Sequence, residues 1–142
     1  MPAVTAEIIA RCSVSAAAED PNYRQTVQCG HHTMIADERP VHGGADAGAM
    51  PYEYLLAALG SCTSITLRMY AERKGWNLGA VSVAVALHRT PERDRIERRV
   101  TVSAEIGAEQ KAKLAEICEK TPVTLTLKSA IGITTSVAAA KP

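Results

Sequence analysis

One apolar stretch, PYEYLLAALGSCTSITLRMYAERKGW, runs from Pro51 to Trp76 and constrains the fold more than any other feature. Pro51 suits the first helical position because its missing N–H would be unpaired there, and Gly75 is typical of the position after a helix. The stretch therefore predicts a helix roughly 35 Å long. Its first five turns are apolar on nearly all sides, which is typical of a buried helix.

Length and charge limit the possible functions. The chain has 142 residues, and we expect residues 1–142 to form a single domain. A net charge of +1 and an aromatic content of 4% favour neither nucleic acid nor a membrane surface as a partner. No apolar run is long enough to span a bilayer, and the N-terminus lacks the pattern of a signal peptide. These features predict a cytoplasmic protein.

The four cysteines, Cys12, Cys29, Cys62 and Cys118, lie far apart in the sequence and form no CxxC pair. In a reducing compartment we expect free thiols rather than disulfides. Cys12 and Cys29 fall in predicted strands and are expected to be core or edge residues. The four histidines lack the spacing of metal ligands, so we expect no metal site.

The sequence predicts two hairpins, the second of them from a strict alternation of apolar residues. The first joins strands 23–29 and 31–36 at Gly30 and follows an edge strand over 4–14; the second pairs 81–87 with 96–106. Between the first hairpin and the helix, the segment Asp37–Met50 is rich in Gly, Pro and Asp, and loops of this length are often functional.

The C-terminal part predicts a helix over 109–120, with Leu114, Ile117 and Cys118 as its apolar stripe. Residues 123–128 suit either a strand or a short helix, and residues 131–137 are expected to form a last short strand. Strands and helices that are segregated in this way predict an α+β fold, with an antiparallel sheet wrapped on the central helix.

Several motifs resemble the OsmC/Ohr family over nearly the whole chain. They are the loop with Asp37, Glu38, Pro40, Gly43, Gly44 and Pro51, the segment LLAALGSCTSITLRMYAERKGW, and the late helix ending in TPVTLTL. The resemblance implies an OsmC-like α+β fold in which antiparallel sheets wrap the two central helices of an intertwined homodimer. It also implies thiol-dependent reduction of hydroperoxides, organic ones especially, in oxidative-stress defence, at two sites on the subunit interface.

Only some of the family's catalytic residues are found at the matching positions of this chain. Cys62 occupies the position of the reactive cysteine, but Thr121 stands where the second cysteine would be. The family's glutamate directly follows the loop proline, whereas here Tyr52 follows it and Glu53 is one residue further on. The nearest candidate for the family's arginine in the N-terminal hairpin is Arg24.

Cys62 is the candidate peroxidatic thiol, and two interpretations of it remain open. Cysteine is often a small buried apolar residue, and a mid-helix position gains little from the helix dipole. A reactive thiolate would need a cationic neighbour such as Arg24 or Arg39. Glu53 would then pin that arginine through a bidentate pair, or would simply favour the positive end of the helix dipole.

Cys118 lies one helical turn before Thr121. It could resolve a sulfenic acid on Cys62 by forming a disulfide, or it could simply pack with Leu114 and Ile117, which we favour. Without a second cysteine, an external thiol of dithiol or lipoyl type would have to regenerate Cys62, and no bound cofactor is expected. The competing hypotheses are an inactive dimer that binds a small apolar ligand at its interface, and a dimer without chemistry.

Overall fold

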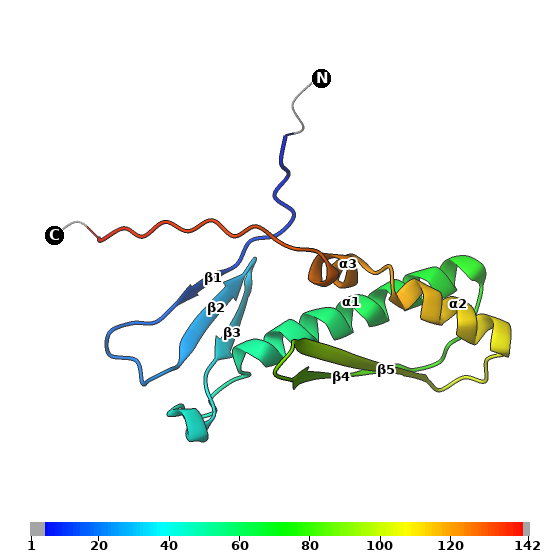
Figure 1. The fold of residues 1–142 in the computed structure, drawn as a ribbon, viewed down its shortest axis with the longest axis horizontal. Coiled ribbons are helices and arrows are strands. Elements are labelled where there is room, and N and C mark those ends of the chain that lie inside the picture. The colour runs from blue at the N-terminus through cyan, green and yellow to red at the C-terminus, as the bar shows by residue number, and fades with distance from the viewer. Residues whose placement is uncertain (1–4, 141–142) are drawn as a thin grey trace. The chain divides into compact units, whose positions relative to one another are not determined.

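The structure is a computed structural model, and it describes residues 5–140. Two compact units divide between Leu55 and Leu56, early in helix α1 (Pro51–Lys74), whose place in the chain is seen in Figure 1. Each unit contains an antiparallel sheet, of three strands in the first and of two in the second. Antiparallel sheets together with helices confirm the predicted α+β class.

The first unit contains a three-stranded antiparallel sheet in the order β1–β2–β3. Its strands are β1 (Ser13–Ser15), β2 (Gln25–Cys29) and β3 (His32–Ala36). Gly30 has a φ of 61° in the turn between β2 and β3, a conformation that glycine adopts readily. This confirms the hairpin predicted at Gly30. The edge strand predicted over 4–14 is reduced to β1, and residue 4 lies outside the described residues.

A disulfide joins Cys12 to Cys29, which corrects the prediction of four free thiols. The strand register explains the bond. Ser13 pairs with Gln28, so Cys12 lies directly opposite Cys29, with the two Cα atoms 4.5 Å apart. Opposed residues in an antiparallel pair come this close, and the distance lies within the range that a disulfide requires. Cys62 and Cys118 remain free thiols.

One buried carboxylate organises the loop that follows β3, which includes the short 3₁₀ helix η1 (Pro40–His42). Asp37 is 3% exposed. Its oxygens accept hydrogen bonds from the backbone N–H groups of Ala47 at 3.1 Å, Glu38 at 2.7 Å, Ala45 at 3.3 Å and Tyr23 at 3.3 Å. These bonds, that of Ala47 first, lower the pKa of Asp37. Gly44 is needed in this loop because a Cβ there would collide with the backbone of Glu38.

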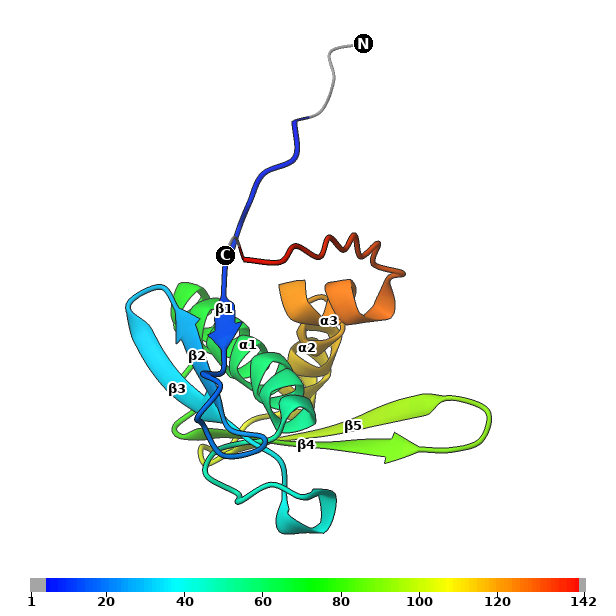
Figure 2. The same cartoon turned by 90° about the vertical axis from the view of Figure 1, so that its left-hand side faces the viewer.

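The second unit packs its helices on one face of a long hairpin, as Figure 2 shows. Its elements are the remainder of α1, the hairpin strands β4 (Val81–Arg89) and β5 (Asp94–Val102), and the helices α2 (Ala108–Cys118) and α3 (Pro122–Lys128). The register pairs Val81 with Val102 and Arg89 with Asp94, which confirms the second predicted hairpin. Residues 123–128, for which the sequence left strand and helix open, lie in α3.

The last strand predicted, over residues 131–137, is wrong: the structure assigns no strand there. Ile133 is 86% exposed and Val137 is 93% exposed. A strand requires the hydrogen-bonding edge of a neighbour, and no strand among residues 5–140 pairs with this segment. The alternation of its side chains was therefore insufficient to define a strand within one chain.

Helix α1 ends at Lys74 and is followed by Gly75 with a φ of 69°, as its sequence predicts. Its buried residues form one stripe at a spacing of four: Leu59, Thr63, Leu67 and Ala71. Part of this stripe packs in a core with residues of α2. In contrast, Ile65 is 53% exposed and Met69 is 60% exposed. The prediction that the helix is buried on nearly all sides is therefore wrong for the single chain, which covers only one face of it.

Candidate functional site

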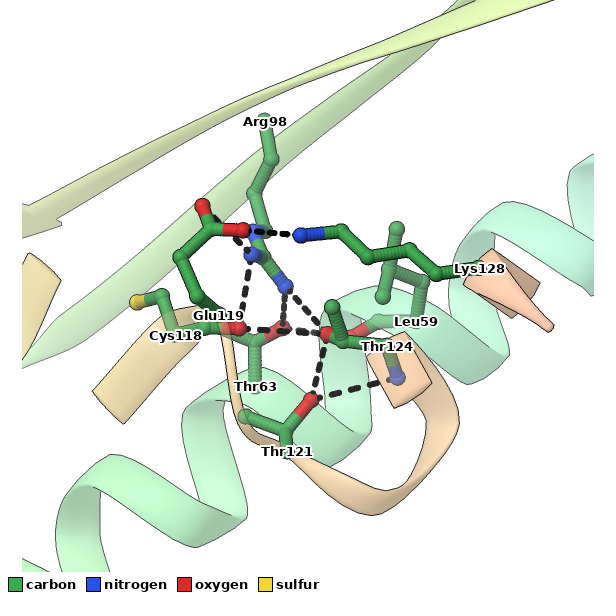
Figure 3. A network of polar contacts seen from close by, with 8 residues as sticks. All are labelled: Leu59, Thr63, Arg98, Cys118, Glu119, Thr121, Thr124 and Lys128. Atoms are coloured by element: carbon green, nitrogen blue, oxygen red, sulfur yellow. Dashed lines mark hydrogen bonds and ion pairs between the residues drawn. The ribbon is translucent and has the colours of Figure 1, made fainter. Parts of the chain in front are cut away.

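A polar network centred on Arg98 connects β5 to all three helices of the second unit (Figure 3). The Nη1 atom of Arg98 donates to the hydroxyl of Thr63 on α1 at 2.9 Å and to that of Thr124 on α3 at 2.8 Å. Its Nη2 atom donates to the backbone carbonyl of Cys118 on α2 at 2.8 Å. One side chain thus holds four elements together.

Sequence reasoning missed Arg98, although the sequence contained a signal. Alternate residues of a strand share a face, so Arg98 lies on the same face of β5 as Ile96 and Val100. Its side chain is only 12% exposed, whereas Arg99 is exposed on the other face. An arginine on the apolar face of an alternating strand predicts a buried polar contact.

Glu119 is the carboxylate near this network. Its Oε1 atom lies 3.8 Å from Nη2 of Arg98, and its other oxygen contacts the ammonium group of Lys128. The hydrogen bond from Lys128 is the main cause of a lowered pKa for Glu119. Because Glu119 is 60% exposed and also pairs with Lys128, it neutralises the largely buried guanidinium only in part.

Thr121, at the position of the family's second cysteine, is fully buried and begins helix α3. Its hydroxyl accepts a hydrogen bond from the backbone N–H of Thr124 at 3.4 Å, which makes Thr121 the N-cap. The two threonine hydroxyls also share a hydrogen bond of 2.6 Å. Thr121 therefore supports the Arg98 network structurally, and its side chain carries no sulfur that could form a disulfide.

Cys118 lies in the apolar core with Leu67, Ala71 and Leu114. It is 8% exposed, and burial is the main cause of a raised pKa for its thiol, although the charge of Arg98 opposes the shift. A raised pKa keeps the thiol protonated, which lowers its reactivity. This placement matches the packing role that the sequence favoured for Cys118.

Cys62 lies on α1 directly before Thr63, and its thiol is free and half-buried. The small residue Gly60 allows β4 to come near the helix, because a Cβ there would lie 3.4 Å from Cγ2 of Val85. A shallow cavity of about 310 Å³, lined partly by Gly60 and Ser61, opens beside this contact. Cys62 is thus a free thiol on α1, next to the small residues Gly60 and Ser61 of the same helix.

The first unit pairs Glu53 with Arg39. The two charged groups lie 3.7 Å apart, and the second oxygen of Glu53 accepts the backbone N–H of Met50 at 3.0 Å, which caps the start of α1. Arg24 is exposed, and its side chain makes no ion pair or hydrogen bond within residues 5–140. Glu53 therefore pairs with Arg39 and not with Arg24, the other candidate arginine.

No three of the His, Cys, Asp and Glu side chains in residues 5–140 are grouped as a metal ion would require. No helix in this range combines the length and the apolar character needed to cross a membrane.

Several solved structures share this fold. A protein from Psychrobacter arcticus, whose name refers to osmotic stress and detoxification, has a TM-score of 0.71 at 13% identity, over 87% of this chain and 90% of its own. An organic hydroperoxide resistance protein OsmC from Legionella pneumophila has a TM-score of 0.65 at 18% identity, over 87% and 92%. An organic hydroperoxide resistance protein from Elizabethkingia anophelis has a TM-score of 0.66 at 13% identity, over 88% and 91%.

A comparison with curated proteins finds no match. The sequence profile of one family, described as OsmC-like protein, matches residues 43–136. This range contains α1 with Cys62, the β4–β5 hairpin, the Arg98 network and α3. Because the match covers more than half of the chain, we conclude that the chain belongs to the OsmC-like protein family.

Proposed function

We propose that this chain is a thiol-dependent reductase of organic hydroperoxides, with Cys62 as the peroxidatic residue. The observation that carries the proposal is a free thiol on α1 at the family's reactive position, one residue before the Thr63 that Arg98 holds. The names of the Legionella and Elizabethkingia proteins, which refer to organic hydroperoxide resistance, support the same chemistry.

The first step oxidises Cys62 and reduces the peroxide. The thiolate attacks the terminal oxygen of the hydroperoxide, a new S–O bond forms, and the O–O bond breaks. The alkoxide leaves as an alcohol after it takes up one proton, and Cys62 becomes a sulfenic acid. A cation near the sulfur would favour the thiolate. Arg24 and Arg39 are the two candidates for this cation, and Glu53 pairs with the guanidinium of Arg39.

The second step needs a reductant from outside the chain. Thr121 carries no sulfur, and Cys118 is buried in the core with a raised pKa. An external thiol would attack the sulfenic acid, release water and form a mixed disulfide. A second thiol would then release Cys62 as a thiolate. A dithiol performs both attacks with one molecule, so dithiothreitol and dihydrolipoamide are the reductants to try.

A homodimer is the assembly that we propose for this function. The exposed apolar side chains of α1, Ile65 and Met69, and those of the C-terminal segment, Ile133 and Val137, support it. A second copy would cover apolar surface that one chain leaves in water. Light scattering checks the assembly, because a monomer mass would contradict it.

Turnover of cumene hydroperoxide with each dithiol tests the enzymatic proposal. The wild type should consume peroxide catalytically, Cys62→Ser should not, and Cys118→Ser should remain active as a matched control. Arg24→Met and Arg39→Met, measured side by side, identify the activating arginine as the one whose loss slows the reaction. Absence of turnover with every thiol would instead favour the second candidate, an inactive dimer that binds a small apolar ligand. The observation in favour of that candidate is the threonine at position 121.

A further inference from the structure

A cavity of about 610 Å³ opens beside the Arg98 network, between the start of β5 and helix α3. Four cationic side chains line it: Arg93, Arg95, Arg98 and Lys128. Its apolar walls come from three other residues, Leu59, Ile96 and Leu127. The cavity therefore combines a cationic lining with apolar walls, and Cys62 is not among its lining residues.

The acids at this cavity already have cationic partners. Asp94 accepts hydrogen bonds of 3.0 Å from both Nε and Nη2 of Arg89. Glu119 contacts Lys128 through one oxygen, and its other oxygen lies 3.8 Å from Nη2 of Arg98, beyond hydrogen-bond distance. Arg93 and Arg95 form no ion pair within residues 5–140. The lining consequently has more positive charge than its own carboxylates neutralise, and a negatively charged ligand would be attracted to it.

Arg98 supplies the most specific feature of the cavity. Its hydrogen bonds go to neutral oxygens, which leave the charge of a largely buried guanidinium without a full counter-charge. They also leave the Nε–H and one Nη2–H without a hydrogen bond inside the described part of the chain. No fully buried side-chain nitrogen or oxygen in that part lacks a hydrogen-bond partner, so the Nε atom of Arg98 is not completely buried.

We propose that this cavity binds an organic anion, a carboxylate carried on a short acyl chain, with its head group at Arg98. Arg89 holds the Asp94 carboxylate through Nε and Nη2, and these are the two nitrogens on which Arg98 retains N–H groups. A carboxylate fits this fork with two parallel hydrogen bonds. The acyl chain would lie along Leu59, Ile96 and Leu127. This site goes beyond the proposed peroxidase and does not depend on Cys62.

Isothermal titration calorimetry of the full-length protein with octanoate, below its micelle concentration, tests the proposal. We expect saturable binding of one octanoate per chain that weakens with added salt, since the attraction is electrostatic. Octanol, which has the same chain without the charge, should not bind measurably. Equal binding of octanol would overturn the role of Arg98. Tighter binding of octyl phosphate would overturn the assignment of a carboxylate, and binding of inorganic phosphate as tight as that of octanoate would overturn the role of the acyl chain.

Matched variants locate the site without removing Arg98, whose loss could unfold the unit. Leu127→Glu places an acid in the cavity and should abolish octanoate binding, whereas Leu125→Glu, on the exposed side of the same helix, should leave it unchanged. Replacing both Arg93 and Arg95 with Gln should weaken binding by about tenfold. Arg99→Gln, on the opposite face of β5, is the control for this double variant. Unchanged binding in Leu127→Glu, or no octanoate binding by the wild type, would overturn the proposal.

Discussion

Asp37 and Arg98 are two largely buried charges, one in each compact unit, and the chain satisfies them in different ways. Asp37 accepts four backbone N–H groups, three of them from residues 38–47 of its own loop. Arg98 donates to oxygens that lie 20 to 35 positions away in the sequence. The loop's own conformation therefore supplies three of the four hydrogen bonds to Asp37, and Tyr23 supplies the fourth. Arg98 finds its partners only after the hairpin and three helices have packed.

Removing the charge of Arg98, whose partners are distant in the sequence, should have the largest effect on stability. Arg98→Met would leave two threonine hydroxyls and the carbonyl of Cys118 without their donor, in a buried setting. We expect a loss of about 4 kcal/mol in the free energy of unfolding, measured by urea denaturation. Arg99→Met, on the exposed face of the same strand, should change it by less than about 0.5 kcal/mol. Similar losses in both variants would show that Arg98 does not organise the unit.

The stability of the first unit should depend more on the disulfide between Cys12 and Cys29 than on the charge of Asp37. Cys12→Ser removes the disulfide that connects positions 17 residues apart, and we expect a loss of about 3 kcal/mol. Alkylation of the denatured protein checks the bond itself: without a reductant only Cys62 and Cys118 should react. Labelling of all four cysteines would mean that the bond is absent. Because disulfides are rare in the cytoplasm, the same labelling in cell lysate also tests the predicted location.

Substitutions of Thr121 test how the Arg98 network continues into α3. Thr121→Ala removes the N-cap hydroxyl and the hydrogen bond to Thr124, and we expect a loss of about 1.5 kcal/mol. Thr121→Ser keeps the hydroxyl and should restore most of the stability. If the Ala and Ser variants are equally stable, the hydroxyl has no structural role and the threonine acts only through its size.

Asp37→Asn should destabilise the first unit near neutral pH, because the amide keeps one acceptor oxygen but turns its NH2 group toward two of the four backbone N–H groups. The bound N–H groups hold the pKa of Asp37 below its ordinary value of 3.8 in the folded state. The ionised carboxylate therefore stabilises the loop fully above that value, and this contribution is lost as the pH falls through the folded pKa. Denaturation of the wild type and Asp37→Asn across this range should show the difference between them shrinking below pH 3.8. A difference that grows in acid would contradict the lowered pKa.

Local signals accounted for much of the fold. Pro51 and Gly75 define the two ends of α1 because helix termini depend on neighbouring residues. Alternation defines the β4–β5 hairpin because exposed and partly buried residues alternate along both of its strands. Thr121 followed by Pro122 is a typical start of a helix, whereas the β-branched residues of 123–128 favour a strand, so the sequence left both open.

The remaining features depend on contacts between distant residues. The bond between Cys12 and Cys29 follows from the register of two strands, which sequence spacing does not reveal. Glu53 pairs with Arg39 because the loop around η1 folds back toward the start of α1, whereas the resemblance to the family pointed to Arg24. At the candidate site, the resemblance identified Cys62 and the substitution at Thr121. The polar network around Thr121 could not be predicted, because it depends on the Arg98 side chain facing the helices.

Stoichiometric oxidation, followed by intact-mass and peptide mass spectrometry, tests whether Cys62 is the peroxidatic residue. After one equivalent of cumene hydroperoxide, we expect a gain of one oxygen atom on Cys62 that a sulfenic-acid trap captures and that a dithiol reverses. The Cys118→Ser variant should give the same product, and Cys62→Ser should give none. An unmodified Cys62, or a disulfide between Cys62 and Cys118, would contradict the account.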